Sequence, residues 1–142
     1  MSDTGGIILL AGRILLAIFA VNAGFAHVTK SANFMGYAKS VNFPIVPITG
    51  WPAGLWLIGG GLSVGLGVWP DIGSLMLLSF ALVAAAYFHR FWELGDEMQK
   101  MNQMLLFWRN TFIVGAALFM FATFVELGPA LRFAITTALI EF

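Results

Sequence analysis

Four long apolar stretches occupy most of this 142-residue chain and limit what it can fold into. A bilayer hydrocarbon core about 30 Å thick requires about 20 mostly apolar residues in a helix. Stretches of that kind cover residues 7–27, 50–69, 72–89 and 105–127. Within lipid every backbone polar group must be bonded inside the protein, so such stretches form helices. The sequence therefore predicts an all-α integral membrane protein, a four-helix transmembrane bundle forming a single domain over residues 1–142.

The composition excludes several classes of protein. Hydrophobic residues make up 60% of the chain and charged residues only 10%, a balance far from that of soluble globular domains. Seven Lys and Arg residues are matched by seven Asp and Glu residues, so no basic surface is available for nucleic acid. The absence of cysteine excludes disulfides, thiolate zinc sites and cysteine-ligated iron–sulfur clusters. Redox chemistry would therefore require a bound cofactor or a partner chain.

The connections between the stretches contain turn and helix signals. Trp69, Pro70 and Asp71 leave room only for a tight reversal, so the second and third helices are expected to form an antiparallel hairpin. Asp96 followed by Gln99 is typical of a helix start after a solvated loop.

A short interfacial helix is expected after the first span. Apolar residues recur with helical spacing at Phe34, Tyr37, Ala38 and Val41. Ser31 precedes them and is predicted to be the N-cap. An amphipathic helix of this kind lies in the membrane interface. Residues 129–142 are too few to span the bilayer, and we predict that they form an interfacial or partner-facing tail.

The distribution of charge predicts the orientation in the membrane. Four spans place both chain ends on one side, with only two basic residues, Arg13 and Arg132. The opposite side carries five basic residues: Lys30, Lys39, Arg90, Lys100 and Arg109. Because basic residues favour the cytoplasmic side, the longer connections are expected to face the cytoplasm and both termini to lie outside.

Two charged residues near one membrane face are predicted to form a structural ion pair. Arg13 lies near the start of the first span, and Glu126 lies near the end of the fourth. An ionisable side chain inside a span is costly and usually faces a partner within the bundle. The alternative is that Arg13 extends its guanidinium to the interface, which would need no partner.

The opposite ends of the four spans gather the richest polar cluster, and we interpret it as a candidate quinone-binding site. The candidate residues are His27, His89, Trp92, Arg109 and Asn110. Imidazoles exchange protons near neutral pH, cationic and amide groups hold carbonyl oxygens, and aromatic side chains form walls. The alternative is that the aromatic and basic residues only mark the membrane interface.

Other cofactors are less well supported. His27 and His89 would allow a haem with two histidine ligands, but both lie near helix ends rather than inside the bundle, so haem is not expected. No metal site is expected, because Glu93, Asp96 and Glu97 have no histidine at ligand spacing. No catalytic residue can be assigned.

Several motifs together resemble the DoxX family of small four-helix bacterial membrane proteins over about residues 7–128. They are Gly12–Arg13–Ile14–Leu15–Leu16, Ala23–Gly24–Phe25, Gly59–Gly60–Gly61–Leu62, Gly65–Leu66–Gly67, Phe88–His89–Arg90–Phe91–Trp92 and Phe107–Trp108–Arg109–Asn110 with Gly115. The resemblance implies a bundle in the bacterial cytoplasmic (inner) membrane, associated with oxidoreductase systems such as the membrane part of thiosulfate:quinone oxidoreductase. The residues of this chain that match the characteristic positions of the family are Arg13, Gly24, His89, Trp92, Arg109 and Asn110. His27 stands where the family often has Lys, and Trp56–Leu57 where it often has Glu.

Three functions remain open at this point. The first is a quinone-interacting, oxidoreductase-associated subunit. The second is a non-catalytic accessory subunit that helps to assemble a larger membrane complex. For the first function, His89 holds the quinone oxygens together with Arg109 or Asn110, and Trp92 forms a wall of the quinone site. The third function, a small permease, would need an oligomer, because four short spans leave little interior and no inverted repeat is visible. The expected partners are the lipid bilayer and other membrane subunits or further copies of the chain.

Overall fold

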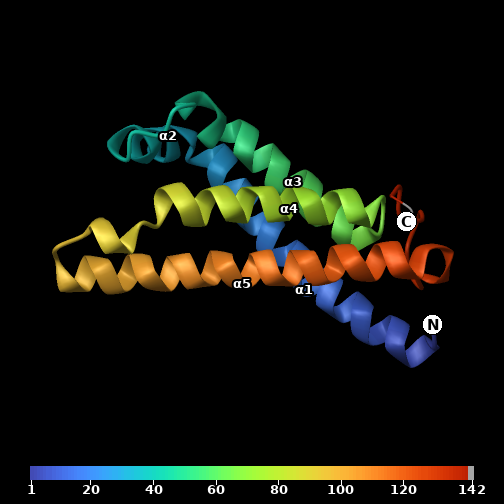
Figure 1. Ribbon diagram of the computed structural model, residues 1–142. Helices are drawn as coiled ribbons and strands as arrows, with labels where there is room; N and C mark the ends of the chain where they lie inside the picture. Colours follow the sequence, from blue (N-terminus) through green and yellow to red (C-terminus); the bar gives the residue numbers. More distant parts are fainter. Residues whose placement is uncertain (141–142) are drawn as a thin grey trace.

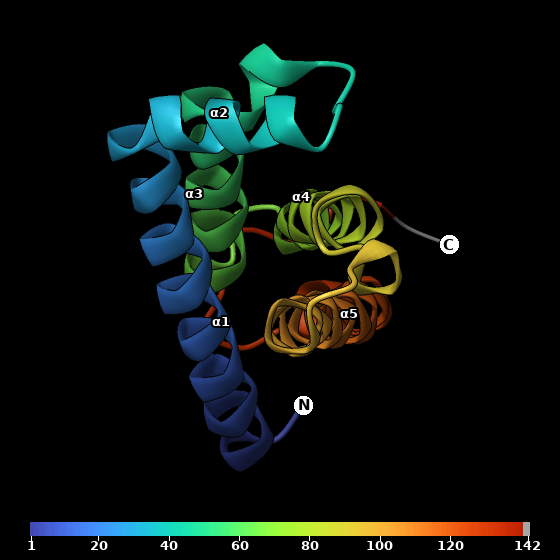
Figure 2. The same ribbon diagram turned by 90° about the vertical axis from the view of Figure 1, so that its left-hand side faces the viewer.

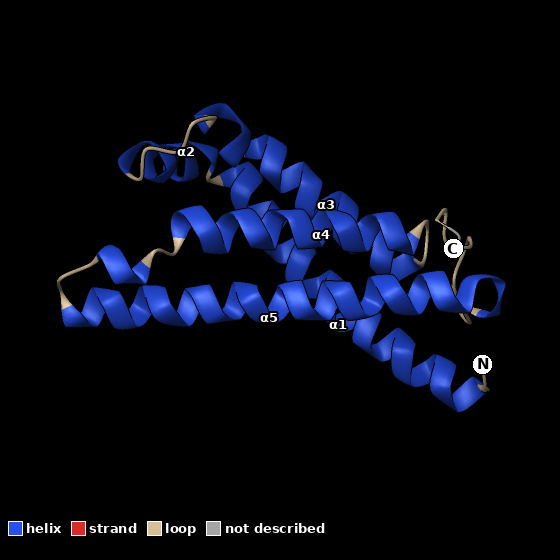
Figure 3. Cartoon of the chain, viewed as in Figure 1, coloured by secondary structure: helices blue, strands red, loops and turns tan. Residues whose placement is uncertain are grey.

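The computed structural model describes residues 1–140, and these residues form helices and loops without a strand (Figure 3). Five α-helices form the body of the protein. They are α1 (Asp3–Thr29), α2 (Ser31–Ser40), α3 (Trp51–Leu66), α4 (Pro70–Val83) and α5 (Glu97–Leu127). Four shorter helical segments connect or end them: η1 (Val46–Thr49), η2 (Ala84–Phe88), η3 (Phe91–Glu93) and η4 (Gly128–Ala130).

The long helices form two antiparallel pairs that cross obliquely (Figure 1). Helix α1 packs against α3, α3 packs against α4, and α4 packs against α5. Viewed along α4 and α5, the α1/α3 pair forms one layer and the α4/α5 pair forms the other (Figure 2). The short helix α2 lies across one end of the α1/α3 pair. This arrangement confirms the predicted all-helical bundle.

Three helical segments are long and apolar enough to cross a membrane: Asp3–Thr29, Pro70–Glu93 and Glu97–Ala130. Helix α3 is apolar but has only 16 residues, a length of about 24 Å. It is shorter than the predicted span 50–69, because Gly67 adopts a left-handed conformation (φ 70°) that ends the helix. The predicted tight reversal follows at once, and α4 begins at Pro70.

Helix α1 contacts α3 at a pair of facing glycines. A Cβ atom placed on Gly24 would lie 2.6 Å from the carbonyl oxygen of Gly54, and one placed on Gly54 would lie 2.6 Å from the carbonyl oxygen of Gly24. Both positions are buried. The backbones of the two helices therefore touch at this level, which is how small residues bring membrane helices together.

The predicted interfacial helix exists, but it begins differently from the prediction. Ser31 is not its N-cap, because Lys30 occupies that position without a side-chain cap bond. Instead, the hydroxyl of Ser31 accepts a hydrogen bond of 3.0 Å from the backbone N–H of Trp51. Ser31 therefore links the start of α2 to the start of α3.

The segment after α5 folds back onto the turn between α3 and α4. The backbone N–H groups of Ile135 and Thr136 donate to the carbonyl of Gly67 at 3.0 and 2.9 Å. The buried carboxylate of Asp71 accepts from the N–H groups of Leu139 and Ile140 at 3.0 and 2.9 Å. The tail up to residue 140 is therefore part of this end of the bundle.

The close contact between α1 and α3 gives a first testable prediction. Replacing Gly54 with Ala should lower the free energy of unfolding by about 1–3 kcal/mol, because the added methyl group must push the two backbones apart. Thermal unfolding in detergent micelles would measure the change. The matched control is Gly115→Ala, which makes the same chemical change at a helical position where the added Cβ meets no neighbouring helix within 4 Å. Equal melting temperatures for the two variants would contradict the direct contact.

Candidate ligand-binding cavity

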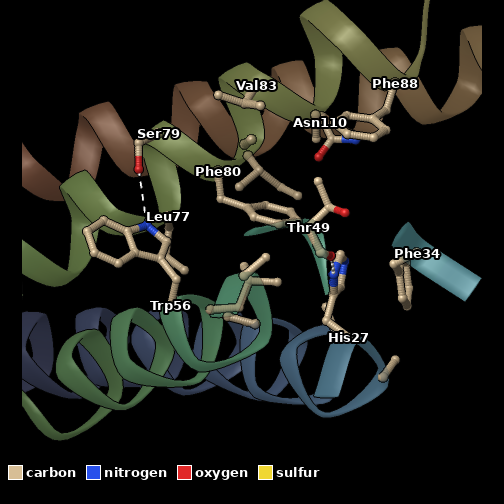
Figure 4. A pocket seen from close by; sticks show the side chains of 18 of the residues that line it. His27, Phe34, Thr49, Trp56, Leu77, Ser79, Phe80, Val83, Phe88 and Asn110 are labelled. Atoms are coloured by element: carbon tan, nitrogen blue, oxygen red, sulfur yellow. Dashed lines mark hydrogen bonds between the residues drawn. The ribbon is translucent and has the colours of Figure 1, made fainter. Parts of the chain in front are cut away.

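A cavity of about 670 Å³ lies between the α1/α3 pair and the α4/α5 pair, toward the end that carries α2. Its volume falls in the range of pockets that hold small organic ligands. The wall is mainly apolar and includes aromatic side chains from several segments. These are Phe19, Phe34, Tyr37, Phe43, Trp56, Phe80 and Phe88. Figure 4 shows part of this wall, with His27, Thr49 and Asn110 as polar side chains on its surface.

His27 is held near the end of α1 by one hydrogen bond and two aromatic contacts. Its Nδ1 lies 2.8 Å from the carbonyl oxygen of Thr49. Its ring stacks on Phe34 at 3.6 Å and meets the edge of Phe80 at 5.4 Å. A carbonyl oxygen only accepts, so Nδ1 carries the hydrogen and Nε2 of the neutral ring is an acceptor.

His89 follows a π-helical turn that ends α4. The turn covers Ala84–Phe88, and His89 itself has left the helical conformation. Such turns displace the residues that follow them and often occur at functional sites. The Nδ1 atom of His89 lies 2.8 Å from Oε1 of Gln103 on α5. This oxygen accepts, so His89 also carries its hydrogen on Nδ1 and has Nε2 as an acceptor when neutral.

Asn110 and Arg109 reach the same cavity from α5. Asn110 is 3% exposed and donates one amide hydrogen to the carbonyl of Leu106 at 2.9 Å. The guanidinium of Arg109 lies 6.0 Å from the ring centre of Phe19 on α1, a cation–π contact between the two helix pairs. Within residues 1–140 Arg109 has no hydrogen bond or ion pair with another side chain. It is therefore a cation on the cavity wall that a ligand can contact.

The structure brings together four of the five predicted site residues but places Trp92 elsewhere. His27, His89, Arg109 and Asn110 all line the cavity, whereas Trp92 does not. The indole of Trp92 packs against Phe91 and Phe107 at 5.2 and 5.7 Å and is 55% exposed. The π-helical turn before it shifts the chain, so the expected wall is provided by other aromatic residues.

Sequence reasoning missed the contribution of three further residues. Trp56 lines the cavity, and its indole N–H donates to the carbonyl of Met76 at 2.9 Å. Thr49 and Gln103 orient the two histidines. In the sequence Trp56 is only a departure from the DoxX pattern, and the roles of Thr49 and Gln103 depend on contacts between distant segments.

A second cavity of about 420 Å³ lies beside the first, and several polar side chains line it. Tyr37 and Phe88 line both cavities, while Gln103 and Asn102 line only the second. The hydroxyl of Tyr37 donates to the carbonyl of Phe88 at 2.8 Å, and burial raises the pKa of this hydroxyl above its ordinary value. Tyr37 is therefore protonated at neutral pH and stays a donor in the partition between the cavities.

The predicted ion pair between Arg13 and Glu126 is not formed. Arg13 is fully buried, and its guanidinium donates to the carbonyl oxygens of Val64 and Gly65 at 2.8 and 3.0 Å. It also donates to the carbonyls of Arg132 and Phe133 at 3.3 and 3.0 Å. Glu126 is exposed. The end of α3 and the folded-back tail supply oxygen acceptors that lie closer to Arg13 than any carboxylate of residues 1–140.

This arrangement predicts how substitutions at the two positions combine. Arg13→Leu should lower the free energy of unfolding by about 3 kcal/mol, because two buried and two partly buried carbonyls lose a charged donor. Adding Glu126→Leu should not restore stability, because Glu126 is not its partner. Chemical unfolding of the single and double variants in mixed micelles would measure this. Rescue by the second substitution would show that the two charges do meet.

The comparison with known families agrees with the motifs in the sequence. The sequence model of the DoxX family matches residues 8–90. The chain belongs to the DoxX family. A search of curated proteins found no match, and a search of solved structures also found none. The region matched to the DoxX family contains Arg13, His27 and His89, while Arg109 and Asn110 lie beyond it.

Proposed function

We propose that this DoxX protein is a membrane subunit of an oxidoreductase system and binds a quinone in the cavity between its helix pairs. The observation that carries the proposal is the composition of the cavity wall. Aromatic and aliphatic side chains surround about 670 Å³, and two imidazoles, a guanidinium and a carboxamide reach the same space. A quinone has a flat apolar ring, two polar oxygens and, in membranes, an apolar tail.

The position of the cavity supports a ligand that arrives through lipid. Phe19, Trp56 and Val83 line it and are between 40% and 48% exposed. The cavity therefore opens between helices that have the apolar outer faces of membrane spans. A lipid-soluble ligand could enter sideways, as a quinone requires.

The chain needs a partner for electron transfer. A bound quinone supplies two-electron redox chemistry, but cysteine is absent from the chain, and no other redox-active group is assigned to it. We therefore include in the proposal a partner protein that exchanges electrons with the quinone. We also propose placement in the bacterial cytoplasmic membrane, as the resemblance to the DoxX family implies. The five basic residues at the α2 end support an orientation with that end toward the cytoplasm and both termini outside.

The proposal is tested by measuring quinone in the purified protein. The chain would be extracted from bacterial membranes into lipid nanodiscs, and the bound quinone quantified by solvent extraction and chromatography relative to protein. We expect about one quinone per chain above the level of empty nanodiscs. His89→Leu and Asn110→Leu should each reduce this retention at least about tenfold, because each removes a polar group that faces the ligand.

Trp92→Phe is the matched control, because Trp92 lies outside the cavity and an aromatic ring at that position keeps its packing. Its quinone content should equal that of the unsubstituted protein. If nanodiscs with and without protein hold equal amounts of quinone, the proposal is wrong. Stable partner chains that co-purify without quinone would instead support the function of an accessory subunit.

A further inference from the structure

The hydrogen-bonding polarity of the cavity indicates which redox form of the ligand it holds. We infer that the cavity selects the reduced, hydroquinone form over the oxidised quinone. This inference rests on the proposed function and adds the redox state of the bound ligand. It follows from which donors and acceptors on the wall are already bonded within the protein.

The hydroxyl and indole donors on the wall are already used. The hydroxyls of Tyr37, Thr49 and Ser79 donate to main-chain carbonyls at 2.8, 2.7 and 2.9 Å. The indole N–H of Trp56 donates to the carbonyl of Met76 at 2.9 Å. None of these groups has a hydrogen left for a carbonyl oxygen of a quinone.

The two histidines offer acceptors instead. Nδ1 of His27 donates to the carbonyl of Thr49, and Nδ1 of His89 donates to Oε1 of Gln103, both at 2.8 Å. A neutral imidazole carries only one hydrogen, so both Nε2 atoms have lone pairs. Neither Nε2 atom is bonded to another group within residues 1–140.

Asn110 and Arg109 are compatible with this selection. Asn110 keeps Oδ1 and one amide hydrogen, and Arg109 keeps its N–H donors. A hydroquinone oxygen can donate its hydrogen to an imidazole and still accept from either group. A quinone oxygen only accepts, so it would face the lone pair of an imidazole and leave that acceptor unpaired. The hydroquinone therefore forms hydrogen bonds with more of the unpaired polar groups on the cavity wall than the quinone does.

Gln103 is the positioning residue for this selectivity. It lines the second cavity rather than the first, so it acts through His89 and not on the ligand. Its Oε1 fixes the hydrogen of His89 on Nδ1. The corresponding partner of His27 is a main-chain carbonyl that no side-chain substitution removes. Gln103 is therefore the position at which the tautomer of one histidine can be changed alone.

The test compares the affinity for one short-chain benzoquinone in its two redox forms. Binding would be measured anaerobically by equilibrium dialysis against protein-containing nanodiscs, with empty nanodiscs to correct for partition into lipid. The pH would be 8, above the ordinary histidine pKa of about 6.5. We expect the hydroquinone to bind at least about tenfold more tightly, because two acceptors gain partners.

A substitution at Gln103 should remove part of this preference. In Gln103→Lys the ammonium donates to Nδ1 of His89, so the ring hydrogen moves to Nε2. Nε2 then cannot accept a hydrogen bond from a hydroquinone hydroxyl, but it can donate one to a quinone carbonyl oxygen. The preference for hydroquinone should fall several-fold. Asn102→Lys is the matched control, because it adds the same charge to the second cavity beside Gln103 without contacting His89 in the wild-type arrangement. Its preference should remain unchanged.

Nitrogen NMR of the histidine rings provides a readout that does not depend on ligand. The chain has two histidines, and both should carry hydrogen on Nδ1 at pH 8, with only one changing in Gln103→Lys. Equal affinity for the two redox forms, or hydrogen on Nε2 of both rings in the unsubstituted protein, would overturn the inference while leaving quinone binding intact. Failure of both forms to bind above empty nanodiscs would overturn the proposed function as well.

Discussion

The buried guanidinium of Arg13 is the interaction on which the arrangement of the helices depends. A charge removed from water is strongly destabilising unless it is hydrogen-bonded, and Arg13 donates to four main-chain carbonyls. Two of them belong to the end of α3 and two to the tail after α5. One residue of α1 therefore ties together segments that are about 120 residues apart in sequence, as its bond to Phe133 shows.

This closed end allows the opposite end to remain open. Asp71 and Gly67 hold the tail at the same level as Arg13, so the turn between α3 and α4 is packed on several sides. At the other end α2 lies across the α1/α3 pair and contributes Phe34 and Tyr37 to the cavity wall (Figure 2). The cavity lies between the two obliquely packed pairs, with His27 and His89 near helix ends and Arg109 and Asn110 in the interior of α5. The end of the bundle around Arg13 therefore stabilises the fold, and the end that carries α2 can hold a ligand.

Much of the candidate site could be predicted from the sequence because helix length fixes membrane depth. His27, His89, Arg109 and Asn110 were expected at one membrane face, and all four line one cavity. The turn at Pro70 and the helix start at Asp96 were also predicted correctly, because local backbone chemistry determines both.

The incorrect predictions share a physical cause. Pairing Arg13 with Glu126 assumed that a buried cation needs a carboxylate, but irregular backbone supplies carbonyl acceptors that sequence patterns do not reveal. Trp92 was expected beside His89, yet the π-helical turn before His89 and the short η3 segment after it direct the indole away. The predicted N-cap at Ser31 is not formed, because its hydroxyl accepts a hydrogen bond from the backbone N–H of Trp51 instead. Each error concerns an interaction across segments or a departure from regular helix.

The central claim is that a quinone occupies the cavity between the two helix pairs. Photoaffinity labelling tests it most directly: a photoreactive quinone is irradiated with the protein in vesicles, and the labelled residues are identified by peptide mass spectrometry. The account predicts labels on cavity residues such as Phe34, Trp56 and Ile113 that an excess of unlabelled quinone suppresses. Labels restricted to outward-facing side chains such as Phe112 and Phe119, unaffected by competition, would contradict it.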